Sequence, residues 1–215
     1  MIKDSAKTIL CYGDSNTWGS VPRSSERYPY SIRWTSILQY MLGDEYEVIV
    51  NGVCGRTLVA SNPEKPWLCG ITHLQAILES AKPVSLIIIM LGTNDVKSTY
   101  SLSAEDIQKH LEQTVLLIQE NQINLEAIPK VLVVCPAPVI TPAINDLDEQ
   151  MVRGLDIFPQ LPKAYKETAD RYGCEFLNAG DSIQSSSIDG YHLNAEAHEK
   201  LAEIISTAIK KLPLT

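Results

Sequence analysis

The sequence predicts an α/β domain in three layers, with a mainly parallel sheet of five strands between two layers of helices. Apolar, strand-like runs alternate along the chain with amphipathic, helix-like segments, which is the pattern of consecutive βαβ units. Ser85–Leu91 is apolar at nearly every position, as is typical of a central parallel strand covered on both faces. No internal repeat, low-complexity tract or linker interrupts the pattern, which indicates one domain over residues 1–215.

The five expected strands are short apolar runs rich in β-branched residues. They are Thr8–Tyr12, Glu47–Asn51, Ser85–Leu91, Lys130–Cys135 and Cys174–Leu177.

Three segments place their apolar residues along one stripe at helical spacing. They are Ser31–Leu42, Ser103–Gln122 and Asn194–Lys211. Ser103 with Asp106, and Asn194, are expected to cap the second and third of these helices. The proline-containing stretches Arg56–Gly70 and Pro136–Pro162 are expected to be irregular loops at the rim of a functional site, because loops of this length in a compact domain are usually functional or interfacial.

The composition is that of a soluble globular protein, with 45% hydrophobic and 20% charged residues. The net charge of −8 and the lack of a basic run argue against nucleic-acid binding. No apolar stretch reaches about 18 residues, so no membrane partner is expected. Residues 1–7 lack the apolar core of a signal peptide, and the odd number of cysteines, five, without Cys-x-x-Cys spacing favours free thiols. These features predict a cytoplasmic protein.

Four polar or glycine-rich turns follow expected strands or precede the last helix. Gly13–Asn16, Asn51–Thr57 and Gly92–Asp95 follow the first three strands, and Asp189–His192 precedes the final helix. Since parallel strands end at the same edge of a sheet, where open α/β proteins bind ligands, these turns are expected to meet there.

Within those turns, Ser15, His192 and Asp189 are the residue types of a nucleophile, its base and the group that orients the base. A serine hydroxyl needs such a base because it is a poor nucleophile at neutral pH. The expected oxyanion donors are the backbone N–H groups of Ser15 and Gly55 and the side-chain amide of Asn94. Gly55 is expected to be glycine because a Cβ would block approach of its N–H to a substrate. The constellation predicts acyl transfer.

Two aromatic residues, Trp18 and Trp67, are candidates for lining a substrate pocket, although ordinary packing is an equal alternative for both. Asp14 and Asp95 are expected to brace turns rather than to act chemically, and Cys54 is expected to be a packing residue.

The three other histidines are expected to be surface or packing residues, because none has an acid placed as Asp189 is placed before His192. No metal site is predicted, because these histidines show no ligand spacing with nearby acids. They are His73, His110 and His198.

Taken in order, the four turns resemble the signature blocks of the SGNH hydrolases of the GDSL-type lipase/esterase superfamily, over essentially the whole chain. Ile9–Gly19 and Ile88–Asp95 are most similar to the bacterial arylesterase branch, in which a relative transfers acyl groups to alcohols in water. The resemblance implies a flavodoxin-like SGNH fold and a serine esterase that acts on small-molecule esters through an acyl-enzyme, without metal or other cofactor. Asn16 stands where the eponymous motif has leucine.

Several alternatives stay open. A carbohydrate O-deacetylase, a thioesterase or a transferase to alcohols would use the same residues, and homo-oligomer formation is undecided. A non-catalytic nucleotide- or phosphate-binding module is disfavoured, because Gly13–Gly19 lacks the glycine and lysine spacing of phosphate-binding loops.

Overall fold

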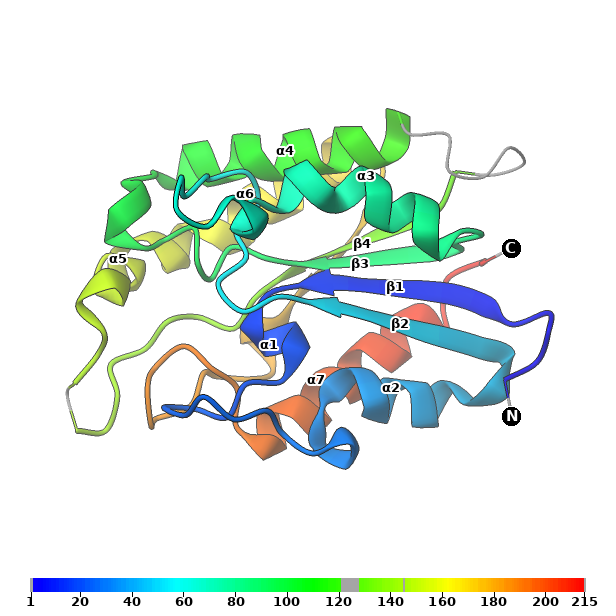
Figure 1. The fold of residues 1–215 in the computed structure, drawn as a ribbon, viewed down its shortest axis with the longest axis horizontal. Helices are drawn as coiled ribbons and strands as arrows, with labels where there is room; N and C mark the ends of the chain where they lie inside the picture. The colour runs from blue at the N-terminus through cyan, green and yellow to red at the C-terminus, as the bar shows by residue number, and fades with distance from the viewer. Residues whose placement is uncertain (1, 121–127, 145, 215) are drawn as a thin grey trace.

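The computed structural model describes residues 2–120, 128–144 and 146–214 (Figure 1). Its sheet has five strands in the order β2-β1-β3-β4-β5, and every neighbouring pair is parallel. The strands are β1 (Lys7–Gly13), β2 (Tyr46–Gly52), β3 (Leu86–Met90), β4 (Lys130–Cys135) and β5 (Glu175–Asn178). The predicted fold class is confirmed, with all five strands close to their expected positions.

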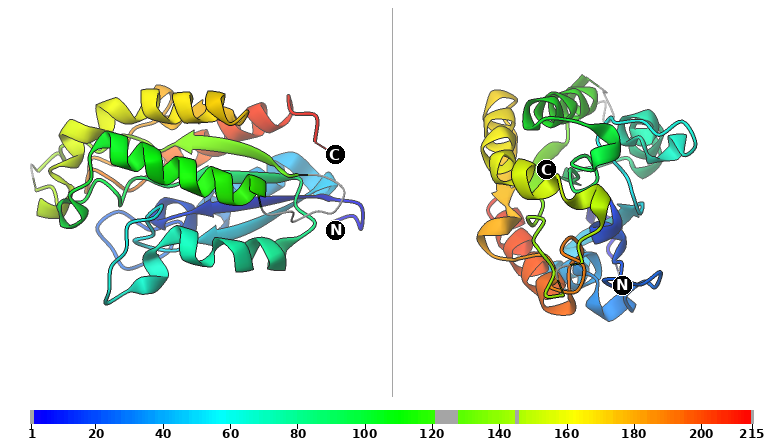
Figure 2. Two further views of the ribbon diagram at one scale, coloured as in Figure 1. Left: turned by 90° about the horizontal axis from the view of Figure 1, so that it is seen from above. Right: turned by 90° about the vertical axis from the view of Figure 1, so that its left-hand side faces the viewer.

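Helices cover both faces of the sheet (Figures 1 and 2). One face carries α1 (Ser15–Trp18), α2 (Trp34–Leu42) and α7 (Ala195–Ile209). The other side carries α3 (Gly70–Ala81), α4 (Ala104–Glu120), α5 (Gly154–Ile157) and α6 (Leu161–Arg171). Short 3₁₀ turns lie at Tyr30–Ile32, Gly43–Glu45, Pro66–Leu68, Ser98–Tyr100, Glu149–Met151, Phe158–Gln160 and Ala179–Asp181.

The sheet has a separate hydrophobic core on each face because side chains alternate along a strand. In β1, Leu10 and Tyr12 belong to the core shared with α3, α4 and α6, whereas Ile9 and Cys11 belong to the core shared with α2 and α7. All five residues of β3 are buried, as predicted for a central strand.

The strand order changes direction between β1 and β3. From β1 the chain first adds β2 on one side and then crosses to β3 on the other. Loops that leave β1 and β3 therefore diverge, and this switch point is where open α/β sheets form ligand crevices.

One predicted helix is divided in the structure. The segment Ser31–Leu42 divides into a 3₁₀ turn and α2, because Arg33 has an extended backbone (ψ 133°). Ser103 and Asp106 form the expected capping pair of α4, whose end at Glu120 adjoins residues 121–127, outside the described part.

The prediction of an irregular loop is confirmed for most of Arg56–Gly70 but is wrong for the second half of Pro136–Pro162. Gly70 begins α3, and the second stretch contains α5 and the start of α6. Pro162 does not interrupt α6 because it lies in the first turn, where a backbone N–H has no partner within the helix.

In the described part of the chain, no helix combines the length and apolar character needed to cross a membrane. All five cysteines are free.

Candidate active site

The structure brings Ser15, His192 and Asp189 into one hydrogen-bonded chain. His192 Nε2 lies 3.0 Å from Ser15 Oγ, and His192 Nδ1 lies 2.7 Å from Asp189 Oδ2. Ser15 begins α1 directly after β1, whereas the other two residues come from the loop before α7. All three side chains are largely shielded from solvent, so the histidine ring is confined between a hydroxyl and a carboxylate.

The Asp189 carboxylate is fixed by backbone donors as well as by the histidine. Its Oδ1 accepts from the N–H groups of Tyr191 (3.2 Å) and His192 (3.0 Å), and its Oδ2 accepts from the N–H of Arg23 (2.9 Å). Burial by itself would raise the pKa of Asp189, but hydrogen bonds from the His192 ring and backbone and from Arg23 outweigh it and lower that pKa. The carboxylate therefore stays charged and can orient the imidazole and stabilise its protonated form.

The turn that carries Ser15 is braced by Asp14, as predicted. Asp14 is the N-cap of α1 and accepts from the Asn16 N–H (2.9 Å). Burial raises the pKa of Asp14 to about 6. The turn packs closely on β2. A Cβ at Gly52 would lie 2.3 Å from the backbone nitrogen of Trp18, so only glycine fits there.

Asn16 ties the serine turn to the histidine loop, a role that the sequence did not reveal. Its Nδ2 donates to the Tyr191 carbonyl (3.0 Å), and its Oδ1 accepts from the Leu193 N–H (3.0 Å). The two bonds lie on either side of His192, so this amide holds the serine turn and the histidine loop together. The only sequence signal is the departure from leucine at this position.

Gly55 and Asn94 lie beside Ser15 and line one cavity with it and His192. Asn94 Nδ2 donates to the Arg56 carbonyl (3.1 Å), which fixes the amide against the loop that carries Gly55. Gly55 has a φ of +86°, the left-handed region that favours glycine, whereas a Cβ there would make only an ordinary contact with Leu68 at 3.4 Å. The left-handed backbone conformation by itself favours glycine at this position.

The loop after β2 is fixed by hydrogen bonds of Arg56 and Asp95. The Arg56 guanidinium donates to the carbonyls of Gly13 (3.0 Å) and Asn51 (2.6 Å), and it lies 4.1 Å from the centre of the Tyr12 ring. Asp95 accepts from the Leu58 N–H at 3.0 Å, in line with the expected bracing role.

The cavity above Ser15 has a volume of about 410 Å³. Trp18 lines it and is held by the Arg27 side chain, whose Nε donates to the Trp18 carbonyl (2.7 Å). Cys54 also lines it and is exposed, so the expectation that this residue is packed inside is wrong. The cause is that Cys54 precedes the left-handed Gly55, where the loop turns outward.

One wall of this cavity is a small hairpin over residues 19–28, which was not predicted from the sequence. Ser20 and Arg27 pair as an antiparallel bridge, and Ser24 and Ser25 face the cavity. The backbone N–H of Arg23, in this hairpin, donates to Asp189. The Arg23 guanidinium forms an ion pair with Asp146, with Nη2 2.7 Å from Oδ2. Pro22 and the serine pair signal a turn here, but no local pattern indicates that the turn reaches Asp189.

Trp67 lies in a neighbouring cavity of about 430 Å³ and not in the one above Ser15. The two cavities share Cys54, Gly55 and Lys97, so they adjoin on the Gly55 side. Trp67 is 54% exposed, which argues against a packing role.

The remaining histidines lie outside this site. His73 is on α3 and His110 on α4, while His198 is fully buried and accepts from the Trp34 N–H (3.3 Å) at Nδ1. Burial, reinforced by His192, lowers the pKa of His198 to about 4, so it is a neutral packing residue. Residues 2–120, 128–144 and 146–214 contain no group of three or more His, Cys, Asp or Glu side chains placed to hold a metal ion.

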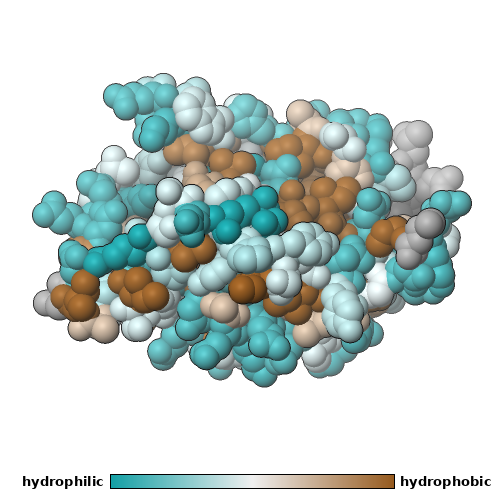
Figure 3. All heavy atoms as spheres, turned by 60° about the horizontal axis from the view of Figure 1, so that its bottom comes forward, coloured by the Kyte–Doolittle hydropathy of each residue, from teal (hydrophilic) through white to brown (hydrophobic). Residues whose placement is uncertain are grey.

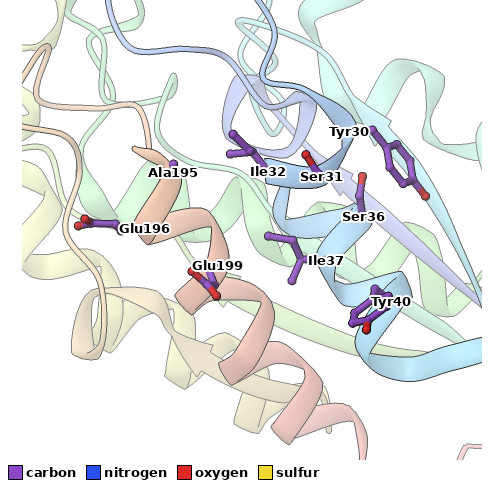
Figure 4. Close-up of a pocket in the computed structure, with 9 residues that line it drawn as sticks. All are labelled: Tyr30, Ser31, Ile32, Ser36, Ile37, Tyr40, Ala195, Glu196 and Glu199. Atoms are coloured by element: carbon purple, nitrogen blue, oxygen red, sulfur yellow. The ribbon is translucent and has the colours of Figure 1, made fainter.

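A larger cavity, of about 570 Å³, lies between α2 and α7 and contains none of the predicted site residues. Figure 4 shows Ile37 of α2 opposite Glu199 of α7. On the face that carries these helices, hydrophobic side chains are interspersed with hydrophilic ones (Figure 3). With no nucleophile–base pair among its lining residues, this cavity offers no acyl-transfer chemistry.

Comparison with known proteins identifies the family. The model of the GDSL-like Lipase/Acylhydrolase family matches residues 11–200, so the chain belongs to that family, whose chemistry is carboxylic ester hydrolysis. It is 35% identical to a carbohydrate acetylesterase from Sinorhizobium meliloti over 95% of this chain and 98% of that one, with a TM-score of 0.88. It is 31% identical to the aryl esterase of M. smegmatis over 96% of this chain and 100% of that one, with a TM-score of 0.90.

An acetylxylan esterase from Xylanibacter ruminicola is 28% identical in an alignment of 228 positions, which covers 97% of this chain and 44% of that protein. The chain thus spans less than half the length of this curated relative.

Proposed function

We propose that this protein is a serine esterase that hydrolyses short-chain acyl or aryl esters through an acyl-enzyme. The observation that carries the proposal is the continuous chain from Ser15 Oγ through His192 to Asp189, with bonds of 3.0 and 2.7 Å. Membership of an ester hydrolase family supports the same chemistry.

In the proposed first step, His192 Nε2 takes the hydroxyl proton of Ser15 while Oγ attacks the ester carbonyl. The negative charge that develops on the carbonyl oxygen would be stabilised by the N–H groups of Ser15 and Gly55 and by the Asn94 amide. His192 then protonates the departing alcohol. Water, or a second alcohol, collects the acyl group in the second step, with His192 again as the base.

Labelling with a fluorophosphonate tests the serine assignment. We expect wild-type protein to be labelled and Ser15→Ala to be unlabelled, with p-nitrophenyl acetate hydrolysis reduced to background in both Ser15→Ala and His192→Ala. Ser103→Ala is the matched control, because Ser103 caps the distant helix α4, and it should label like the wild type. Labelling that persists in Ser15→Ala would overturn the proposal.

Carbohydrate O-deacetylation is the second candidate. The similarity to the Sinorhizobium meliloti acetylesterase and the exposed Trp67 beside the catalytic cavity favour it, since an indole face is a good platform for a sugar ring. Acetate release from acetylated sugars, compared with p-nitrophenyl acetate and an acyl thioester, distinguishes the substrate classes.

A further inference from the structure

The cavity that contains Trp67 adjoins the catalytic cavity but contains neither Ser15 nor His192. Any group bound there would be a part of the substrate remote from the reacting bond. Its polar lining is made of Asn62, Lys65, Lys97, Thr99 and Gln150.

The two side-chain amides in this lining have their oxygens occupied by nearby donors. Gln150 Oε1 accepts from Ser98 Oγ (2.8 Å) and from the Thr99 N–H (3.0 Å). Asn62 Oδ1 accepts from the Glu64 N–H (2.9 Å). Each amide is therefore left with its NH₂ group as the end available to a ligand.

Two lysines add positive charge to these donors. Neither Lys65 nor Lys97 forms an ion pair with a carboxylate in the part of the chain that the structure describes. Lys97 is largely enclosed, and burial lowers its pKa; Asp148 and Asp14 oppose that effect at longer range, and Lys65 adds to it. Two cations beside one cavity without a bound carboxylate repel each other, and an anion placed between them would remove this cost.

Building on the proposed esterase activity, we propose that this cavity binds a carboxylate on the substrate, so that the preferred substrates are anionic esters. Lys65, Lys97 and the amide nitrogens of Asn62 and Gln150 are the donors, and Trp67 supplies an apolar wall. The carboxylate belongs either to the acyl group, as in a monoester of a dicarboxylic acid, or to the alcohol, as in an acetylated sugar acid.

Two pairs of esters, each made of an anionic ester and a neutral analogue of similar size, test the proposal. The acyl pair is 4-nitrophenyl hydrogen succinate and 4-nitrophenyl methyl succinate, with uncatalysed hydrolysis subtracted. The alcohol pair is an acetylated methyl glucuronoside and the corresponding acetylated methyl glucoside. In at least one pair, we expect kcat/KM of the wild type for the anionic ester to exceed that for the neutral one about tenfold, and the ratio to fall as salt is added.

Lysine variants locate the effect. Lys97→Gln should lower the anionic-to-neutral ratio about tenfold, and the more exposed Lys65→Gln about threefold. Because Lys65 is exposed, its variant tests the site even where Lys97→Gln fails to fold. Lys130→Gln is the matched control, since Lys130 is exposed at the amino end of β4, opposite the catalytic edge, and should leave the ratio unchanged.

A preference in only one pair supports the proposal and shows which half of the ester carries the carboxylate. Hydrolysis of the neutral esters without a preference in either pair, or an equal loss of ratio in Lys130→Gln, overturns the carboxylate site and leaves the esterase proposal intact. Failure to hydrolyse any of the four esters contradicts the esterase proposal itself.

Discussion

Asn16 joins the nucleophile and the base through one side chain, with bonds on both sides of His192. We expect Asn16→Leu, which restores the residue of the eponymous family motif, to lower kcat at least tenfold. Leucine removes both bonds and leaves the buried Leu193 N–H without its acceptor, at a cost of about 1–3 kcal/mol in stability. Steady-state kinetics together with urea unfolding measure the two effects.

The matched control for Asn16→Leu is Asn194→Ala. Asn194 caps α7 by accepting from the Ala197 N–H (2.9 Å), and its loss should cost about 1 kcal/mol in stability with kcat almost unchanged. If Asn16→Leu loses stability but keeps wild-type kcat, the side chain holds the fold together and does not set the geometry of the site.

Asp95 predicts a pH dependence of stability. Burial, with a smaller contribution from Asp14, raises its pKa to about 7, so between about pH 4 and 7 the folded protein binds more protons at this carboxyl than the unfolded chain does. This group therefore makes the free energy of unfolding fall as pH rises through that window.

Asp95→Asn cannot ionise and retains an oxygen for the Leu58 N–H. We expect it to gain stability relative to the wild type as pH rises from 4.5 to 8, by roughly 1–4 kcal/mol in total. Urea unfolding of both proteins at several pH values measures this difference. A difference that is the same at every pH would show that Asp95 is not the titrating group.

The hairpin over residues 19–28 acts through its backbone. Arg23 has a φ of +56° and donates its N–H to the Asp189 oxygen that also contacts His192. Arg23→Gly keeps the N–H and suits the left-handed conformation, so kcat should stay within a few-fold of the wild type although the contact with Asp146 is lost. Arg23→Pro removes the donor and imposes a negative φ, so kcat should fall at least tenfold.

Comparing these two variants separates the contribution of the Arg23 backbone N–H to kcat from that of the Arg23 guanidinium. Kinetics on p-nitrophenyl acetate, with circular dichroism to check folding, provide the measurement. Similar losses in both variants would mean that the Arg23–Asp146 ion pair, and not the N–H on Asp189, is what the hairpin contributes.

For the whole molecule, the volume of the catalytic cavity predicts substrate size. A space of about 410 Å³ bounded by the hairpin and the Asp189–His192 loop suits short acyl chains. We expect kcat/KM to decrease from acetyl and butyryl to octanoyl and longer p-nitrophenyl esters. We also expect some benzyl acetate from vinyl acetate and benzyl alcohol in buffer, because partial exclusion of water lets an alcohol compete for the acyl-enzyme.

A chain-length series and product analysis by chromatography test these two expectations separately. Faster turnover of long-chain esters would contradict the narrow cavity. Brisk hydrolysis without benzyl acetate would contradict acyl transfer alone.

Local sequence patterns were sufficient for the fold and for the main residues of the candidate site, but not for Asn16 or Arg23. Apolar runs such as Ser85–Leu91 identify buried strands, and strand ends in a parallel sheet share one edge, so the placement of Ser15 and Asn94 beside each other follows without knowledge of any loop. His192 was recognisable because its carboxylate partner lies only three residues away.

Contacts between loops could not be predicted from the sequence and are known only from the three-dimensional structure. The bond from the Arg23 backbone to Asp189 spans 166 positions, and the bonds of Asn16 to the histidine loop span 175 and 177. Trp67 likewise belongs to a second cavity that only the path of residues 56–70 creates. Periodicity reports which face of an element is buried, but the course of a loop depends on backbone conformations and distant partners that leave no repeating pattern.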